Sequence, residues 1–309
     1  MTAKTRTARV RVPASTSNLG AGFDCVGVAV DRWLTASVKV DESCPAVTIS
    51  RSGAVANLSG KPEEDLIHTG FRLACEVRRA IVPRGLVYEV ASTIPVARGL
   101  GASAAALVAG AFLAKGALNL DLNPEAIAIL CARYEGHPDN VAPSVFGGAI
   151  LGIPLNGGEN YAFSELEIHS RLALVFAVPQ LEVLTSEARR VLPKSVQHAI
   201  AVQAAAKGAA LVEGLRRGDE ALLAFALDDV LHVPYRRHLI PGYDSIVGAA
   251  IKAGAFGATL SGSGSTMVAV SLRDNAPQVG VAMQSTWRTQ GQTAEVIISD
   301  RSVTGARLE

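Results

Sequence analysis

The chain has 309 residues, of which 49% are hydrophobic and 18% are charged, and its formal net charge is +1. This length exceeds what one compact core usually holds and suits two domains of roughly 150 residues each. Because there is no excess of basic residues to release counterions, the composition argues against a protein that binds nucleic acid. We expect a globular protein whose electrostatic effects are local.

The four cysteines are far apart in the sequence and form no C-x-x-C pair. This pattern disfavours a zinc site and is typical of reduced, mostly buried thiols in a cytoplasmic protein. The segment MTAKTRTARVRV has no apolar stretch, so we expect no signal peptide. The longest apolar run, residues 100–114, is shorter than the roughly 20 residues of a membrane span. We therefore expect no contact with a membrane.

Hydrophobic periodicity and turn residues predict the elements of the first half of the chain. A proline at the first helical position and an early acid mark one helix start, in the Asn-Pro-Glu sequence at residues 123–125. The predicted elements are strands over 9–12, 28–40, 46–49 and 86–94, and helices over 65–81, after the Gly-rich turn near residue 101, and from 123 to about 136.

A polar, Gly-rich stretch at residues 154–163 is interpreted as the region of the domain boundary, which gives domains over 1–158 and 159–309. The elements predicted beyond it are helices over 186–191, 196–217, 220–231, 243–253 and 277–289, and strands over 172–178, 258–260, 267–271 and 294–299. Strands and helices are mixed without a regular alternation, so the α+β class is favoured over a doubly wound sheet.

The stretch TIPVARGLGASAAA, which begins at Thr93, places glycines at a turn between a strand and an Ala-rich helix. Glycines there usually let backbone N–H groups close on an anion. Gly99, Gly101 and Ala104, with Asp121 further on, also fit a dinucleotide-binding pattern. Pro95 disfavours that alternative, because proline is rare in a central strand. A tight packing turn without a ligand is a second alternative, and we favour phosphate binding.

Polar residues gather in further stretches, VPASTSNLGAGFDCVG from Val12, YEGHPDNVAPSVFGG from Tyr134 and LSGSGSTMVAV from Leu260. Each has an ordinary interpretation, as a solvated turn, a capped helix end and a hairpin turn respectively. Such clusters are otherwise scarce in the chain. Their number indicates that separate loops converge on one phosphate-rich ligand.

In this order, the stretches resemble the motifs of the GHMP kinase superfamily, and TSEARRVLP and VPYRRHLIPG resemble segments of its homoserine kinases. The resemblance runs from about residue 8 to about residue 300. It implies a ribosomal-S5-like N-terminal α+β domain, a ferredoxin-like C-terminal domain and a site between them. It also implies a cytoplasmic, homodimeric enzyme of threonine biosynthesis that uses ATP and Mg²⁺ to phosphorylate the side-chain hydroxyl of L-homoserine.

The same resemblance implies roles for individual residues. The ATP-binding residues are Pro95, Val96, Ala97, Arg98, Gly99, Leu100, Gly101, Ala102, Ser103, Ala104 and Ala105, with Asp65 on the adenine side. The Mg²⁺ ligands are Ser103 and Glu135, which count as catalytic together with Asp139 and Asn140. The substrate-binding residues are Asn18, Asp24, His137, Asp139, Thr185, Arg189, Arg236 and Gly262. Of these, the arginines can each grip a carboxylate through a planar guanidinium, and Asp24, helped by Asn18, can accept from an ammonium.

The sequence departs from the family pattern at several positions. Ala102 stands where a serine is usual, and Ala21 and Ser265 stand where prolines are common. The N-terminal motif lacks the lysine that assists a catalytic aspartate in mevalonate-phosphorylating relatives. The remaining alternatives are a kinase for another alcohol (a sugar or a mevalonate-like compound), a dinucleotide-dependent oxidoreductase, and a catalytically inactive ligand sensor of this fold.

Overall fold

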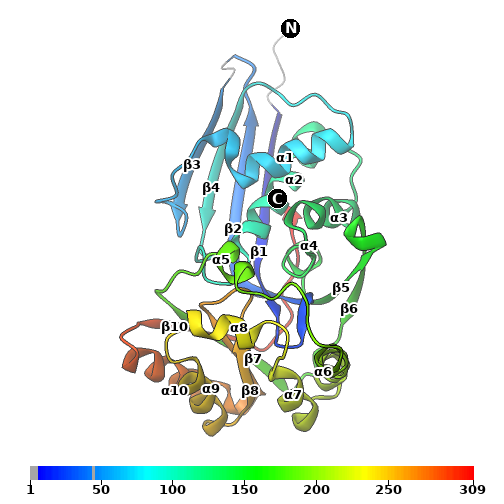
Figure 1. Ribbon diagram of the computed structural model, residues 1–309. Coiled ribbons are helices and arrows are strands. Elements are labelled where there is room, and N and C mark those ends of the chain that lie inside the picture. The colour runs from blue at the N-terminus through cyan, green and yellow to red at the C-terminus, as the bar shows by residue number, and fades with distance from the viewer. Residues whose placement is uncertain (1–5, 44–45) are drawn as a thin grey trace.

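The computed structural model describes residues 6–43 and 46–309, which form two sheets with their helices. Figure 1 shows the larger sheet in the upper part of the molecule and the smaller one in the lower part. Cys25, Cys75 and Cys131 carry free thiols, the latter two buried, while Cys44 lies outside the described residues. This mixed, two-domain architecture confirms the predicted α+β class.

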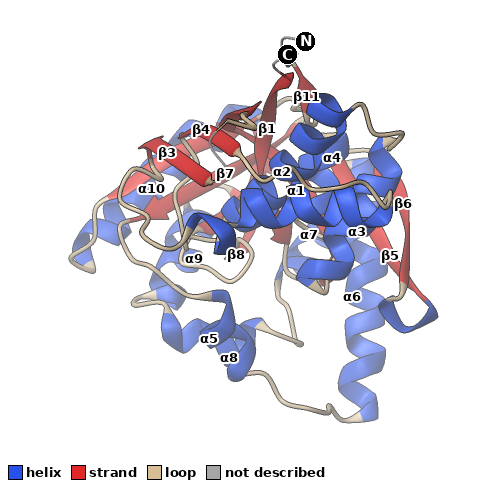
Figure 2. Ribbon diagram, turned by 90° about the horizontal axis from the view of Figure 1, so that it is seen from above, coloured by secondary structure: helices blue, strands red, loops and turns tan. Residues whose placement is uncertain are grey.

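The first sheet has the strand order β11-β1-β2-β4-β3, with β5 and β6 extending it from β2. Only the β3–β4 pairing is parallel among the described strands. Figures 1 and 2 show helices packed over one face. The elements are β1 (Arg6–Asn18), β2 (Gly22–Val40), β3 (Val47–Gly53), α1 (Leu66–Val77), β4 (Leu86–Ser92), α2 (Ala102–Leu118), α3 (Pro124–Glu135), α4 (Val141–Phe146), β5 (Ala149–Leu155), β6 (Asn160–Leu166) and β11 (Arg307–Leu308).

Strand β1 is longer than predicted, because the run that was expected to leave the strand after Val12 stays in it as far as Asn18. The polar residues of this run are buried, with Ser17 and Asn18 only 1% and 2% exposed. A buried strand of hydroxyl groups is stable only if those groups find partners. Here they do, since Thr16 bonds to Ser261 across the domain interface at 2.8 Å. The interpretation of this stretch as a solvated turn is therefore wrong.

Helix α2 is buried on almost every side, as its many alanines predict. It crosses α1 at close range through Gly110, where an added Cβ would overlap the carbonyl oxygen of Ile67. Among the described residues, the chain contains no helix that combines the length and the apolar character needed to span a membrane.

The second sheet has the order β10-β7-β9-β8, and all of its pairings are antiparallel. In chain order the helices connect β7 to β8 and β9 to β10, which is the ferredoxin-like arrangement. Its elements are β7 (Leu172–Pro179), α5 (Thr185–Arg190), α6 (His198–Arg217), α7 (Glu220–Leu227), α8 (Val233–Arg236), α9 (Tyr243–Lys252), β8 (Ala255–Leu260), β9 (Met267–Leu272), α10 (Ala276–Thr289) and β10 (Ala294–Ser299). Short 3₁₀ turns at Pro62–Glu64, Asn156–Gly158, Arg237–Leu239 and Arg273–Asn275 complete the chain.

The predicted boundary after residue 158 falls in the turn of the β5–β6 hairpin. Strand β6 pairs with β5 along its whole length, so the first sheet continues to Leu166. The second sheet begins at Leu172. We therefore propose that the boundary lies in residues 167–171. The predicted boundary fell within the hairpin because a polar hairpin turn has the same composition as a linker.

The helix predicted over residues 220–231 is shorter, since α7 ends at Leu227. The Asp229 carboxylate accepts the backbone N–H groups of His232 and Val233 at 2.7 and 2.8 Å. Because Asp229 satisfies these backbone donors, a new helix, α8, begins here and α7 does not continue. This change of direction brings the end of α8 to the domain interface.

The α1–α2 crossing gives a prediction about stability. We expect Gly110→Ala to lower the free energy of unfolding by about 1–3 kcal/mol, because the added methyl group must push the helices apart. The matched control is Gly248→Ala in α9, where no described atom lies within 4 Å of the added Cβ. The control should raise stability by about 0.5–1 kcal/mol through helix propensity. Urea unfolding measures both, and an unchanged Gly110→Ala protein would contradict the observed crossing.

Candidate active site

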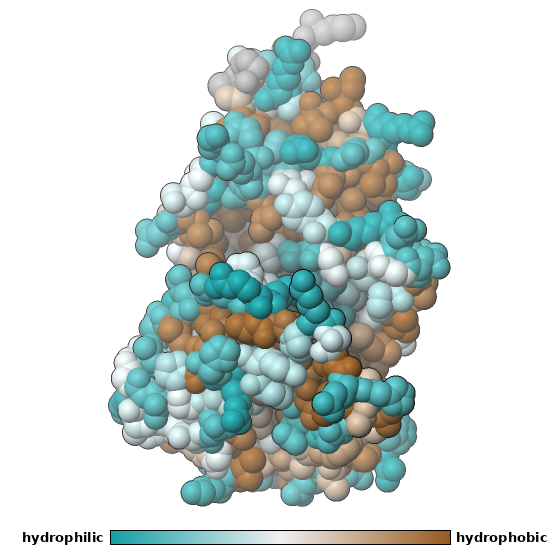
Figure 3. All heavy atoms as spheres, in the orientation of Figure 1, coloured by the Kyte–Doolittle hydropathy of each residue, from teal (hydrophilic) through white to brown (hydrophobic). Residues whose placement is uncertain are grey.

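A cleft of about 430 Å³ lies where the two domains meet. Its walls come from β1 and β2, the loop before α2, the α3–α4 connection, α5, α8 and the turn after β8. Figure 3 shows hydrophilic side chains gathered over α5 at the edge of this hollow. The separate stretches singled out in the sequence therefore do converge on one cavity.

The Gly-rich loop enters α2 through glycines in left-handed backbone conformations, with φ angles of 73° at Gly99 and 66° at Gly101. A side chain at either position would overlap Ser261 or Ser15. Gly101 is the N-cap of α2 and, within the described chain, no side chain caps this helix. The first N–H groups of a 17-residue helix thus remain available at the cleft.

Residues 95–103 of the predicted phosphate loop line the cleft, whereas Ala104 and Ala105 do not. Both side chains are fully buried, and the Ala105 N–H donates to the Gly101 carbonyl at 2.9 Å. An amide that already belongs to the helix cannot also bind a phosphate. Ala105 therefore has no free amide for a phosphate, and Ala104 can contribute only its backbone N–H.

The Arg98 side chain contacts protein groups as well as the cleft. Its guanidinium donates to Gln180 at 3.0 Å and lies 3.8 Å from Glu182. Arg98 therefore joins the phosphate loop to the segment after β7 while still lining the cleft.

The far end of the cleft is lined by apolar side chains, among them Val55, Leu58 and Val96, and by Asp65. Asp65 caps α1 by accepting the Ile67 N–H at 2.8 Å. Its other oxygen accepts from Arg51 at 2.5 Å. The carboxylate that was predicted on the adenine side is thus already occupied by a structural pair, and no sequence signal pointed to its partner Arg51.

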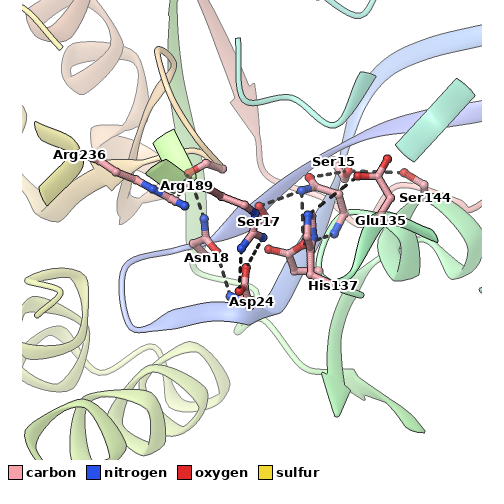
Figure 4. Close-up of polar contacts among 12 residues, drawn as sticks. Ser15, Ser17, Asn18, Asp24, Glu135, His137, Ser144, Arg189 and Arg236 are labelled. Atoms are coloured by element: carbon pink, nitrogen blue, oxygen red, sulfur yellow. Dashed lines mark hydrogen bonds and ion pairs between the residues drawn. The ribbon is translucent and has the colours of Figure 1, made fainter. Parts of the chain in front are cut away.

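Polar side chains from β1 and from the α3–α4 connection form one hydrogen-bonded cluster (Figure 4). His137 Nδ1 and Asp139 Oδ1 are 2.5 Å apart, and Asp139 also accepts the Asn140 N–H at 2.8 Å. The Asn140 amide donates to Ser17 at 3.0 Å and accepts from Ser15 at 3.1 Å. Ser15 and Ser17 were not predicted as site residues, although the STS run in the first motif contained the signal.

The electrostatics of this cluster favour an ion pair. Burial alone would raise the pKa of Asp139, but the charge and hydrogen bond of His137 lower it below its ordinary value. Burial likewise opposes the charged form of His137, and Asp139 outweighs burial and raises the pKa of His137. Asp139 is therefore ionised in the folded protein.

Glu135 ends α3 and faces the cleft beside Ser103. Burial raises the pKa of this carboxyl above its usual value, although His137 and the Ser103 hydroxyl oppose the shift. Among the described residues its only ion-pair partner is His137, 3.9 Å away, while Arg189 acts on it from a greater distance. A partly buried carboxylate next to a hydroxyl, with no lysine or arginine in ion-pair contact, suits a hard divalent cation, so these residues fit Mg²⁺.

Asp24, His137 and Asp139 also bring ligand atoms within 4.8 Å of one another. Their atoms are engaged elsewhere, since Arg189 holds both oxygens of Asp24 at 2.8 and 3.3 Å. Asn18 connects this corner to the second domain by accepting the Asp24 N–H and donating to the Gly262 carbonyl. Asn18 is thus used for positioning.

The predicted substrate residues from the C-terminal domain, Thr185, Arg189, Arg236 and Gly262, all line the cleft. Arg236 is only 2% exposed. Burial and the neighbouring Arg189 lower the pKa of Arg236 to about 10. The guanidinium still carries its charge at neutral pH.

Comparisons with known proteins agree with this geometry. The model of the GHMP kinase N-terminal domain matches residues 65–148, and that of the GHMP kinase C-terminal domain matches residues 211–289. The homoserine kinase of Gloeobacter violaceus is 40% identical over 286 residues, which are 90% of this chain and 92% of the relative. That of a Nostoc species is 38% identical over 288 residues, 93% and 94% of the respective chains.

Among solved structures, the homoserine kinase from Cytophaga hutchinsonii superposes with a TM-score of 0.86 at 26% identity, covering 100% of this chain and 99% of that one. The antiparallel β2–β4 pairing before the phosphate loop also excludes the doubly wound sheet that the dinucleotide alternative required. The chain belongs to the homoserine kinase family of the GHMP kinases.

Proposed function

We propose that this protein transfers the γ-phosphoryl group of ATP to the side-chain hydroxyl of L-homoserine and so forms O-phospho-L-homoserine for threonine biosynthesis. The observation that carries the proposal is that one cleft joins an uncapped helix N-terminus to charged groups of both signs, Asp24 from the first domain and Arg189 and Arg236 from the second. The names of the relatives support the same acceptor. The cytoplasmic location and the homodimer stay predictions.

The triphosphate binds at the entrance of α2. Phosphoryl transfer has a loose transition state, so positioning and neutralisation of charge supply most of the catalysis. The N–H groups of Ala102, Ser103 and Ala104 belong to the first turn of a helix that begins at Gly101, where the helix dipole favours negative charge. The apolar end of the cleft leaves room for the base of the nucleotide.

Ser103 and Glu135 would hold Mg²⁺, and the ion supplies neutralisation of charge on the phosphate oxygens when bound. Ala102, which precedes Ser103 in the first turn, has no side-chain oxygen. Ser103 therefore provides the only hydroxyl at these two positions. Glu135 lies within the same wall of the cleft as the acceptor cluster. This places the donor and acceptor sites side by side.

The acceptor hydroxyl is oriented by Asp139 and Asn140. Asp139 is held by the His137 ring and by the Asn140 N–H. The Asn140 side chain is held by Ser15 and Ser17. A carboxylate whose pKa is lowered is a weak base, so it orients the alcohol and takes the proton only as the new phosphorus–oxygen bond forms. The missing lysine of the N-terminal motif agrees with this role.

The charged ends of the amino acid are held by groups from both domains. Arg236 and Arg189 bind the carboxylate, and Asp24 accepts from the ammonium. A sugar or mevalonate-like acceptor lacks one or both of these ends, which disfavours the alternative acceptors.

Release of ADP with a panel of acceptors tests the proposed function. The panel is L-homoserine, D-homoserine, L-serine, mevalonate and galactose at equal concentration. We expect L-homoserine to give the highest kcat/KM by at least about tenfold, because each missing or misplaced charged contact costs on the order of 1.5–3 kcal/mol. A higher value for galactose or mevalonate would overturn the acceptor, and absent turnover with intact ATP binding would favour the inactive sensor.

For Ser103→Ala we expect kcat to fall about 10- to 100-fold, the range seen when groups that hold or orient a metal ion are removed. Added Mg²⁺ should restore only part of the loss. The matched control is Ala102→Ser at the preceding position, which restores the usual family serine and should keep the activity. Unchanged kcat in Ser103→Ala at ordinary Mg²⁺ would remove Ser103 from the metal site.

For Arg236→Lys we expect the KM for homoserine to rise about 10- to 100-fold, because an ammonium cannot make the paired bonds of a guanidinium. The KM for ATP should change less than about twofold. Steady-state kinetics with each substrate varied in turn measures both. Equal rises for the two substrates would contradict a role of Arg236 at the carboxylate.

A further inference from the structure

The Arg236 guanidinium is buried without a carboxylate partner among the described residues. It rests on neutral groups, since Nε donates to the Ala188 carbonyl at 3.0 Å and Nη1 lies 3.4 Å from the Gly262 carbonyl. The ring of Phe23 lies 5.1 Å from the guanidinium carbon. Figure 4 shows the guanidinium directed toward Arg189 and Asn18, and so into the cleft. Its charge is thus left for a ligand.

One more neutral contact comes from His232, one helical turn before Arg236. The distance from His232 Nδ1 to Arg236 Nη1 is 3.4 Å. Guanidinium nitrogens only donate hydrogen bonds, so Nδ1 must be the unprotonated nitrogen of the ring. His232 Nε2 lies 3.1 Å from the Gly20 carbonyl, which only accepts, so Nε2 carries the proton. The two partners together fix one neutral tautomer.

The imidazole has no freedom to turn. His232 is fully buried, and its ring stacks on Phe23 with centroids 4.8 Å apart and planes 17° apart. The Asp229 carboxylate holds the backbone at this point by accepting the His232 N–H at 2.7 Å. Burial lowers the pKa of His232 to about 4, which keeps the ring neutral at physiological pH.

We propose that neutral His232 is a positioning residue that sets the direction in which Arg236 presents its guanidinium to the carboxylate of the substrate. The inference rests on the proposed function. An aspartate in place of His232 would orient Arg236 equally well but would neutralise it. A neutral acceptor orients the guanidinium and leaves its full charge for the ligand.

Substitutions that each remove one of the two hydrogen bonds of the His232 ring test the proposal. The Oδ1 atom of His232→Asn takes nearly the place of Nδ1 and keeps an acceptor for Arg236, while contact with Gly20 is lost. His232→Gln keeps a donor for Gly20 and loses the Nδ1 acceptor. We expect the KM for homoserine to rise about tenfold in His232→Gln and less than about threefold in His232→Asn, with the KM for ATP unchanged in both.

Stability should follow the opposite order, because His232→Asn leaves both a cavity beside Phe23 and an unpaired Gly20 carbonyl. Thermal unfolding of the two variants measures this order. A KM that follows stability would mean a merely structural role and would overturn the proposal. In the background of Arg236→Lys, His232→Gln should add less than about twofold to the KM, and a full additive effect would also overturn it. The exposed His238 supplies the control, since His238→Gln should leave kinetics and stability unchanged.

Acid unfolding gives a check on the neutral ring. Asp229, Arg236 and Asp24 are the charged groups that act on His232. Its pKa in the folded protein, about 4, lies below the ordinary value of 6.5. The unfolded chain therefore binds the extra proton between these values, and stability falls as the pH falls through this window. Both His232 variants should lose this part of the acid sensitivity, and an unchanged slope would contradict a neutral, buried His232.

Wild-type kinetics separates a failure of this inference from a failure of the proposed function. If the wild-type protein phosphorylates homoserine and the His232 variants keep the wild-type KM, only the positioning role fails. If the wild-type protein prefers another acceptor in the panel, the proposed function fails first.

Discussion

The close approach of three backbone segments at the phosphate loop is the constraint on which the site depends. The Ser15 N–H bonds to the Leu100 carbonyl, and the Gly262 N–H bonds to the Ser17 carbonyl, at 3.2 and 3.1 Å. The Ser261 hydroxyl then donates to the Gly99 carbonyl at 2.6 Å. Side chains cannot fit into this junction, which explains why the motifs are rich in glycine and serine. A single cavity with both a nucleotide end and an acceptor end follows from it.

The sequence was a good guide wherever a local rule decides the structure. The Ala-rich helix, the amphipathic α1 and the Asn-Pro-Glu helix start depend on neighbours a few residues away, and the structure contains all of them. Local rules failed at β1, where Ser15 to Asn18 look like a loop until distant hydroxyl partners are known. They also failed at the β5–β6 turn, whose polar composition does not distinguish a hairpin from a domain linker.

The hydrogen-bond partners of the site residues were the feature that the sequence predicted least well. The sequence suggested that Asp65, Asn18 and Arg98 belong near the ligands, and each of them does line the cleft. Yet Asp65 pairs with Arg51, Asn18 with Gly262 and Arg98 with Gln180. These pairings join residues that are 14, 244 and 82 positions apart, and residue types alone do not reveal which of several nearby groups a side chain will choose.

The pairing of Asp24 with Arg189 has a consequence for selectivity among metabolites. These opposite charges satisfy each other across the domain interface. A neutral polyol that separated them would leave both charges without a partner. A zwitterion replaces each charge with one of the same sign, so the exchange keeps the electrical balance. Under the proposed function, the pair therefore favours molecules that carry their own ammonium and carboxylate.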